Sequence, residues 1–176
     1  MADIVDKATR SRMMSGIRGK NTRPEIIVRK ALFSMGYRFR LHRKDLPGKP
    51  DIVLPKKNTA IFINGCFWHA HEGCRYAKLP ETRKEFWREK LLRNKVRDAQ
   101  SRKELKNSGW RVLTIWECFI RSSEKIGMMK PELESWIEGS RTEGNLEDIV
   151  RYVDRPHLHD LQTPPCTQRI TKNRKP

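Results

Sequence analysis

Two cysteines and two histidines lie within nine residues, at positions 66–74, directly after a run of apolar residues. Three of them, Cys66, His71 and Cys74, offer thiolate and imidazole groups, which zinc prefers in a tetrahedral site. A fourth ligand must come from elsewhere in the chain, and Cys118 is the available candidate. The alternative is a set of ordinary buried thiols and a packed histidine, since free cysteines are often buried. The local density favours zinc, and four filled positions make it structural rather than catalytic.

A second candidate for chemistry is Asp51, which follows a proline and opens the apolar run 52–54. A carboxylate at the start of a core strand can hold Mg²⁺, which positions water beside a phosphodiester and stabilises the developing charge. This is the layout of restriction-endonuclease-like nucleases. However, the acidic-x-Lys pair expected on the next strand is missing, because positions 63–65 read Ile-Asn-Gly. Pro-Asp pairs are also common in turns, so these residues alone leave the nuclease assignment open.

The elements that must position these residues follow from hydrophobic periodicity and from helix and turn signals. Asn21 or Thr22 can cap a helix that runs to about Met35, and Gly36 ends it. The patterns further along predict strands over 37–41, 51–54, 59–64 and 110–116, a long polar helix over 81–107 and a short helix over 130–138, with Pro131 in its first turn. That order predicts an α/β fold, with a mixed sheet flanked by helices.

The charge balance indicates the kind of partner. Lys and Arg number 38 against 21 Asp and Glu, a formal net charge of +17. Such an excess favours a polyanion, because each neutralised phosphate releases counterions. A ribosomal-type or merely soluble basic protein is the alternative, but five Trp argue against a purely structural RNA-binding tail. No stretch approaches the roughly 20 apolar residues of a membrane helix, and the start lacks a secretory signal. We therefore expect a cytoplasmic protein without disulfides.

Five motifs along the chain share one family resemblance. They are Asn64–His69 followed by His71, Pro47–Asp51, Gly109–Cys118, the opening Asp6–Ser11, and Phe86-Trp87-x-x-Lys90. Together they closely resemble the very short patch repair (Vsr) DNA mismatch endonucleases, over about residues 1–138 in collinear order. The Gly-Cys-Phe-Trp-His run at 65–69 is the most specific of them.

The resemblance implies a function and a set of partners. It implies a restriction-endonuclease-like fold with one structural zinc, and Mg²⁺-dependent nicking of double-stranded DNA on the 5′ side of the thymine in a T·G mismatch. Such mismatches arise when 5-methylcytosine is deaminated. The implied partners are mismatch-repair factors and a cognate cytosine methyltransferase. The protein would act as a monomer near the nucleoid, with no membrane partner.

The resemblance also assigns catalytic and metal-binding roles. Asp51 and the backbone carbonyl of Ile63 would bind Mg²⁺, and Glu25 would support the metal-bound waters. His69 would be the general base, a task that suits an imidazole with a near-neutral pKa. The zinc ligands implied by the family are Cys66, His71, Cys74 and Cys118.

DNA contacts of three kinds are implied as well: aromatic residues entering from the major groove, apolar residues wedging from the minor groove, and polar residues reading the mismatched pair. These are, in that order, Phe67, Trp68 and Trp87, then Met14 and Ile17, then Lys90 and Asn94. The alternative for Trp87 is a place in the core.

The expected organisation has three parts. Residues 1–20 form a DNA-contacting arm, residues 21–139 form the endonuclease domain, and residues 140–176 form a poorly ordered basic extension with few aliphatic residues. We therefore expect a chain that ends near Arg141 to keep its fold and activity.

Two other functions stay open. One is a related restriction-type nuclease that cuts unmismatched DNA, and the other is a non-catalytic, zinc-stabilised DNA-binding protein. The set of Glu25, Asp51 and His69 speaks against the second, since binding alone needs none of them.

Overall fold

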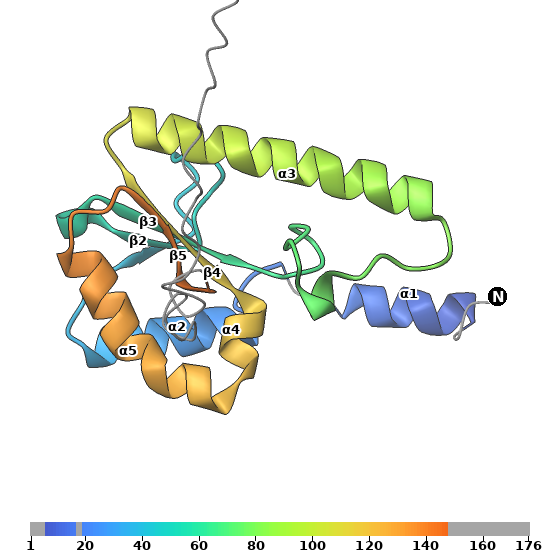
Figure 1. Ribbon diagram of the computed structural model, residues 1–176, viewed down its shortest axis with the longest axis horizontal. Coiled ribbons are helices and arrows are strands. Elements are labelled where there is room, and N and C mark those ends of the chain that lie inside the picture. The colour runs from blue at the N-terminus through green and yellow to red at the C-terminus, as the bar shows by residue number, and fades with distance from the viewer. Residues whose placement is uncertain (1–5, 17–18, 148–176) are drawn as a thin grey trace, which may run out of the picture.

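The computed structural model describes residues 6–16 and 19–147. A five-stranded mixed sheet lies at its centre, in the order β1-β2-β3-β4-β5 (Figure 1). The strands are β1 (Arg40–Leu41), β2 (Ile52–Leu54), β3 (Thr59–Asn64), β4 (Arg111–Trp116) and β5 (Glu143–Asn145). The pairs β1–β2 and β2–β3 are antiparallel, whereas β3–β4 and β4–β5 are parallel. This confirms the predicted mixed α/β architecture.

Helices cover both faces of the sheet (Figure 1). They are α2 (Arg23–Ser34), α3 (Lys84–Asn107), α4 (Glu117–Arg121) and α5 (Ser123–Glu138), whereas α1 (Lys7–Ser15) lies apart from the sheet. Short 3₁₀ turns lie at Pro55–Lys57 and Arg75–Ala77. The main core lies between the sheet and α2, α4 and α5, around fully buried Leu32, Phe119 and Trp136. On the other face, α3 contributes Leu105 to a smaller cluster.

The start of α2 shows why the chain forms a helix there. The Thr22 hydroxyl accepts a hydrogen bond from the backbone N–H of Glu25, and the Glu25 carboxylate accepts one from the backbone N–H of Thr22. This capping box satisfies two of the unpaired donors at the helix N-terminus. At the other end, Gly36 has a φ of +85°, a conformation that glycine adopts without steric cost. The predicted helix and its glycine stop are thus confirmed.

The last helix begins earlier than its sequence suggests. α5 starts at Ser123, capped by the Ser122 hydroxyl, so Pro131 lies inside the helix and not in its first turn. A proline there removes one helical hydrogen bond. Burial of Met129, Leu133 and Trp136 from the same helix offsets that cost. The predicted start at residue 130 was therefore wrong.

The C-terminal boundary expected at residue 139 also differs from the structure, because the sheet continues beyond it. β5 pairs in parallel with β4, and Leu146, just after it, is fully buried. A Cβ at Gly144 would lie 2.1 Å from Trp136 Nε1, so only glycine permits this approach. Residues 143–147 therefore belong to the domain. The rest of the expected extension, 148–176, lies outside the described residues.

This packing reverses the expectation for a shortened chain. A protein ending after Arg141 should lose about 2–5 kcal/mol of unfolding free energy, the usual cost of deleting a buried leucine such as Leu146. Urea denaturation of this protein and of one ending after Glu147 would measure the difference. Equal stability of the two would show that β5 contributes nothing.

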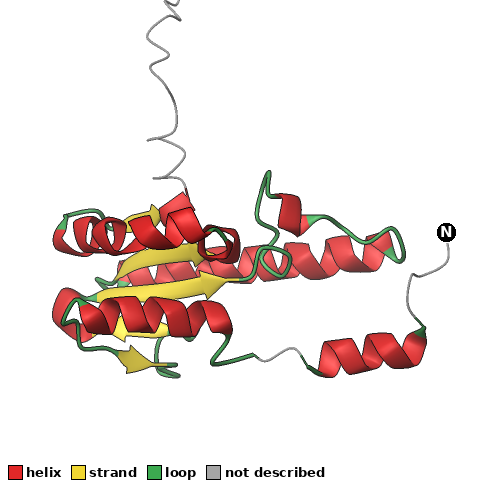
Figure 2. Cartoon of the chain, turned by 90° about the horizontal axis from the view of Figure 1, so that it is seen from below, coloured by secondary structure: helices red, strands yellow, loops and turns green. Residues whose placement is uncertain are grey.

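Two helices extend away from the sheet on the same side. The N-terminal half of α3 projects past the strands, and α1 lies beyond the sheet near that end (Figures 1 and 2). α1 occupies part of the expected arm. Met14 falls in α1, but its side chain and all of Ile17 lie outside the described residues. Within the described part of the chain, every helix is too short or too polar to cross a membrane.

Candidate functional site

Asp51 immediately precedes β2, and the antiparallel pairing of β2 with β3 brings it beside β3. Its Oδ2 accepts a hydrogen bond of 2.8 Å from the backbone N–H of Ile63. Burial raises the pKa of Asp51 to about 6, and the nearby Glu25 carboxylate also raises it, although the Ile63 N–H acts in the opposite direction. A cation bound beside Asp51 would displace this proton to solvent, because a nearby positive charge stabilises the buried carboxylate.

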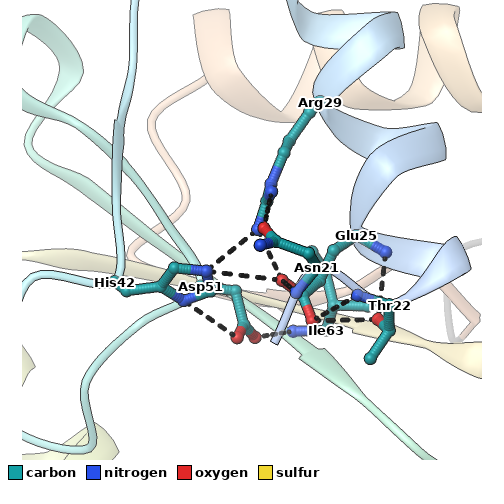
Figure 3. Close-up of polar contacts among 7 residues, drawn as sticks. All are labelled: Asn21, Thr22, Glu25, Arg29, His42, Asp51 and Ile63. Carbon is teal, nitrogen blue, oxygen red and sulfur yellow. Dashed lines mark hydrogen bonds and ion pairs between the residues drawn. The ribbon is translucent and has the colours of Figure 1, made fainter. Parts of the chain in front are cut away.

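Glu25 is buried beside Asp51 and takes part in a dense polar network (Figure 3). Its oxygens accept hydrogen bonds from the backbone N–H groups of Asn21 and Thr22, at 3.0 and 3.2 Å. The Arg29 guanidinium binds Glu25 Oε2 from one turn further along α2 and also donates to the Asn21 side chain. The network fixes the position of the Glu25 carboxylate.

His42 connects this network to Asp51 (Figure 3) and was not predicted from the sequence. Its Nε2 lies 3.1 Å from Arg29 Nη2 and 3.6 Å from Glu25 Oε2, while its Nδ1 lies 4.0 Å from Asp51 Oδ1. His42 also has a φ of +47°, which is uncommon for a residue other than glycine and often marks a functional site.

The donor set at this point suits a divalent cation. Glu25, His42 and Asp51 each offer one ligand atom, and these atoms lie within 4.8 Å of one another. Oxygen donors from two carboxylates are the ligands that Mg²⁺ prefers. The residues present therefore fit a magnesium site centred on Asp51.

His69 reaches the same region from the turn that follows β3. Backbone hydrogen bonds from His69 to Gly65 and from His71 to Cys66 fold this turn tightly. The His69 Nδ1 lies 2.6 Å from Oδ2 of Asp98 on α3. In the tautomer with the proton on Nδ1, the Nδ1–H donates a hydrogen bond to Asp98 and Nε2 has the free lone pair. Asp98 was not predicted, because it lies 29 residues away in the chain.

One cavity of about 940 Å³ brings these groups together. It is bordered by Glu25 and Asp51 of the polar network, by the turn after β3 and by α3 around Asp98. Its lining includes candidate catalytic residues, their hydrogen-bond partners and candidate DNA-contacting residues. These are Glu25, Asp51, Ile63, Phe67, Trp68, His69 and Asp98.

Three aromatic side chains form a cluster at the edge of this cavity. Ring centroids are 5.1 Å apart for Phe67 and Trp68, 5.2 Å for Phe67 and Trp87, and 6.0 Å for the two tryptophans, all edge-to-face. The Lys90 ammonium lies over Trp68 and Trp87, at 5.3 and 5.1 Å. The Asn94 amide donates to the Trp68 carbonyl at 2.9 Å. We name Phe67, Trp68 and Trp87 the aromatic cluster.

The candidate zinc ligands also meet in space, at the carboxyl ends of β3 and β4. The parallel register pairs Asn64 with Trp116, so the residues that follow each strand lie side by side. One ligand atom from each of four residues lies within 4.8 Å of all the others; these are Cys66, His71, Cys74 and Cys118. The donor set of three thiols and one imidazole fits zinc.

Hydrogen bonding shifts the pKa values of two of these thiols in opposite directions: the pKa of Cys66 falls, whereas that of Cys118 rises because it hydrogen-bonds to Cys66 and is partly buried. The hydrogen bond from Cys118 lowers the pKa of Cys66 to about 5, and the contact with His71 also lowers it. A thiolate is the form that binds zinc. The three described cysteines are free thiols, which leaves them available for a metal.

Comparison with known proteins decides the family. The family described as DNA mismatch endonuclease Vsr matches residues 2–75. The type II nicking enzyme V.XorIIP of Xanthomonas oryzae pv. oryzae is 44% identical over 140 residues, which cover 80% of this chain and 100% of that protein. The DNA mismatch endonuclease Vsr of Escherichia coli K12 is 41% identical over 149 residues, 84% of this chain and 95% of that protein. The chain belongs to the Vsr family. It is therefore an endonuclease, as the sequence motifs predicted.

Among solved structures, the homing endonuclease I-Bth0305I catalytic domain is similar with a TM-score of 0.44 and 23% identity. The likeness covers 65% of this chain and 93% of that one. It is too distant to add to the Vsr assignment.

The structure brings together most residues that the Vsr resemblance singled out. Glu25, Asp51 and His69 line one cavity, and the four candidate zinc ligands form one cluster. Trp87 is half-buried within the aromatic cluster and is absent from both core clusters. The Ile63 contact with Asp51 is through its N–H, and the role expected of its carbonyl stays a prediction.

The zinc assignment predicts the effect of removing one thiol. Replacing Cys118 with serine should lower the zinc content to below half of the parent value and the melting temperature by about 10 °C, because structural zinc contributes directly to folding. Elemental analysis and calorimetry on the same preparation would measure both. Cys166→Ser, outside the described residues, is the matched control. Full zinc content in Cys118→Ser would remove this residue from the ligand set.

Proposed function

We propose that this Vsr-family protein is a Mg²⁺-dependent endonuclease with a restriction-endonuclease-like fold. In this proposal it nicks one strand of double-stranded DNA on the 5′ side of the thymine in a T·G mismatch. The observation that carries the proposal is the single cavity in which Glu25, Asp51 and His69 lie next to Phe67 and Trp68. The proposed hydrolytic groups and the proposed stacking groups would therefore face the same bound DNA.

Asp51 would hold the magnesium ion, together with the Ile63 carbonyl. When bound, the ion stabilises charge on the phosphate and lowers the pKa of the attacking water. Glu25 sits within reach of the same position and is kept there by the α2 cap and by Arg29. Its fixed carboxylate would orient water molecules around the ion.

His69 would accept the proton of the attacking water at Nε2. This requires Nδ1 to be protonated and Nε2 to be neutral, which is the tautomer that the 2.6 Å contact with Asp98 favours. Asp98 also holds the imidazole in one orientation and stabilises the imidazolium that forms. The arrangement has the logic of a histidine–aspartate pair in hydrolases.

Recognition of the mismatch would depend on the aromatic cluster. Opening a base step costs a few kcal/mol, and a T·G wobble pair lowers that cost relative to T·A. Stacking on each aromatic ring returns roughly 1–3 kcal/mol. Lys90 and Asn94 lie beside the cluster and would read the pair, while Met14 and Ile17 of the arm would enter the minor groove.

The proposed activity also implies a biological role and a set of partners. The E. coli relative is named as a mismatch endonuclease, whereas V.XorIIP is named as a type II nicking enzyme. A repair role after 5-methylcytosine deamination implies a cognate cytosine methyltransferase and mismatch-repair factors as partners. It further implies a monomer that acts on the nucleoid in the cytoplasm.

The test uses the zinc-loaded full chain with Mg²⁺ and two end-labelled duplexes that differ only in T·G or T·A at one position. A nick 5′ of the thymine in the T·G duplex alone is the expected result. Equal cutting of both duplexes would instead indicate a restriction-type nuclease. Binding of both without cutting would indicate a DNA-binding protein. Asp51→Ala protein, purified in parallel, controls for contaminating nucleases.

The aromatic cluster gives a further prediction. Trp68→Ala should reduce single-turnover nicking of the T·G duplex by about ten- to a hundred-fold, the rate equivalent of one lost stacking contact. Zinc content and far-UV circular dichroism should not change, because Trp68 is half-buried and lies outside both core clusters. A folded variant that nicks at the parent rate would show that stacking at Trp68 is unnecessary.

A further inference from the structure

Glu147 reaches the zinc cluster from beyond the predicted domain boundary. It follows β5 and fully buried Leu146, and its own side chain is only 9% exposed. Its Oε2 lies 2.8 Å from His71 Nε2. Cys118 Sγ also contacts the same oxygen, at 2.9 Å. A buried carboxylate therefore lies against two of the four candidate zinc ligands.

The two nitrogens of His71 face different partners. Nδ1 lies 3.5 Å from Cys118 Sγ, on the side of the thiol cluster, whereas Nε2 faces Glu147. The ring also stacks on Trp116, with centroids 3.8 Å apart and planes 3° from parallel. Its plane is thus fixed by Trp116 and its rotation within that plane by Glu147.

A histidine binds a metal through one nitrogen, and the group that accepts a hydrogen bond from the other nitrogen selects the tautomer. Carboxylates do this at many zinc sites, where they also increase the basicity of the imidazole ligand. The geometry at His71 matches that arrangement, since Glu147 is an acceptor placed at Nε2.

We propose that Glu147 is the positioning residue of the zinc site. It accepts the Nε2–H hydrogen bond of His71 and so directs the Nδ1 lone pair to the metal. When Cys118 binds zinc it releases its thiol proton to solvent, and Glu147 Oε2 then accepts the hydrogen bond from the His71 Nε2–H alone. Because Glu147 is carried by the segment after β5, zinc retention depends on the docking of that strand onto β4.

The charge of the site favours this role over direct ligation. Zinc with three thiolates and one neutral imidazole has a net charge of −1. A fifth, anionic ligand would add another negative charge inside a buried site. As an acceptor from the imidazole, Glu147 is stabilised by a polarised N–H donor instead.

The inference rests on the zinc assignment and is tested with the full chain, first shown to hold one zinc. The measurement is the rate of zinc transfer to a chromophoric chelator in excess. Glu147→Ala should release zinc about 10–100-fold faster than the parent, the rate equivalent of the metal affinity usually lost with such a partner. Glu147→Gln should release zinc at an intermediate rate, because its amide oxygen still accepts a hydrogen bond.

The matched control is Glu143→Gln, which removes an exposed carboxylate of the same segment that pairs with Lys106 and Arg102. Its release rate should stay within about twofold of the parent, since surface ion pairs contribute little. Parent rates in folded Glu147→Gln and Glu147→Ala would overturn the proposal. If Glu147→Ala does not fold, a parent rate in Glu147→Gln alone overturns it.

Cobalt substitution separates positioning from direct ligation. The thiolate-to-cobalt charge-transfer band should have the same intensity and position in the parent and in Glu147→Gln, because the ligand set is unchanged. A changed spectrum would make Glu147 a ligand and overturn the proposal. A parent that holds no zinc would overturn the zinc assignment and this inference together, whereas loss of nicking with zinc retained would concern the proposed function alone.

Discussion

Asp51→Ala should reduce single-turnover nicking of a T·G duplex by about a thousand-fold or more, with DNA affinity within a few-fold of the parent. The substitution removes the carboxylate that we propose as the magnesium ligand, and such ions contribute several kcal/mol of transition-state stabilisation. Packing changes little, because the side chain borders the cavity. Quenched-flow nicking and filter binding on one preparation would measure both quantities.

The matched control for this prediction is Asp45→Ala. Asp45 is an exposed carboxylate that pairs with Arg43, away from the cavity lining. Its variant should nick at the parent rate. Comparable nicking by Asp51→Ala and the parent in Mg²⁺ would place the catalytic metal elsewhere.

His69→Ala should lower the nicking rate by about 10²–10⁴-fold, the range expected for loss of a general base. The loss should fall on the rate of the chemical step and not on DNA affinity. A single-turnover rate measured across DNA concentrations separates the two. If affinity falls and the maximal rate does not, His69 binds DNA instead of activating water.

A second variant, at Asp98, tests the hydrogen-bond partner of His69 while His69 itself stays in place. Asp98→Asn keeps the size of the partner side chain but weakens control of the His69 tautomer, as expected for the 2.6 Å contact. We expect a smaller rate loss than in His69→Ala, with zinc content unchanged. An Asp98→Asn rate equal to that of the parent would remove Asp98 from the mechanism.

Much of the fold could be predicted because its main elements have strong local signals. β3 and β4 are apolar runs bounded by turn residues, and α2 has a capping box at one end and Gly36 at the other. β5 has no such signal, since Glu-Gly-Asn contains neither β-branched nor aromatic residues. Its place depends on contacts with β4 and Trp136, which only the folded chain provides.

In the candidate site too, residues with a local sequence signal could be predicted, whereas residues brought together only by folding could not. The candidate zinc ligands could be proposed because three of them lie within nine residues, and Asp51 because it precedes a core strand. Residues that support the candidate catalytic groups lie further away in the sequence. Asp98, which contacts His69, is 29 residues from it, and His42, which contacts Arg29, is 13 residues from that arginine. No periodicity links such pairs, so they become visible only in the structure.

The aromatic cluster has a kinetic consequence. Phe67, Trp68 and Trp87 pack on one another in the DNA-free protein, and the Lys90 ammonium lies over two of the rings. Under the proposed function, a ring that enters a base step exchanges part of these contacts for stacking on bases. Association should therefore be biphasic in stopped-flow tryptophan fluorescence: a fast phase that depends on DNA concentration and slows with added salt, then a slower phase whose rate is independent of DNA concentration. On fully paired DNA only the first phase should appear, and the protein would then move along the duplex with its rings still packed together.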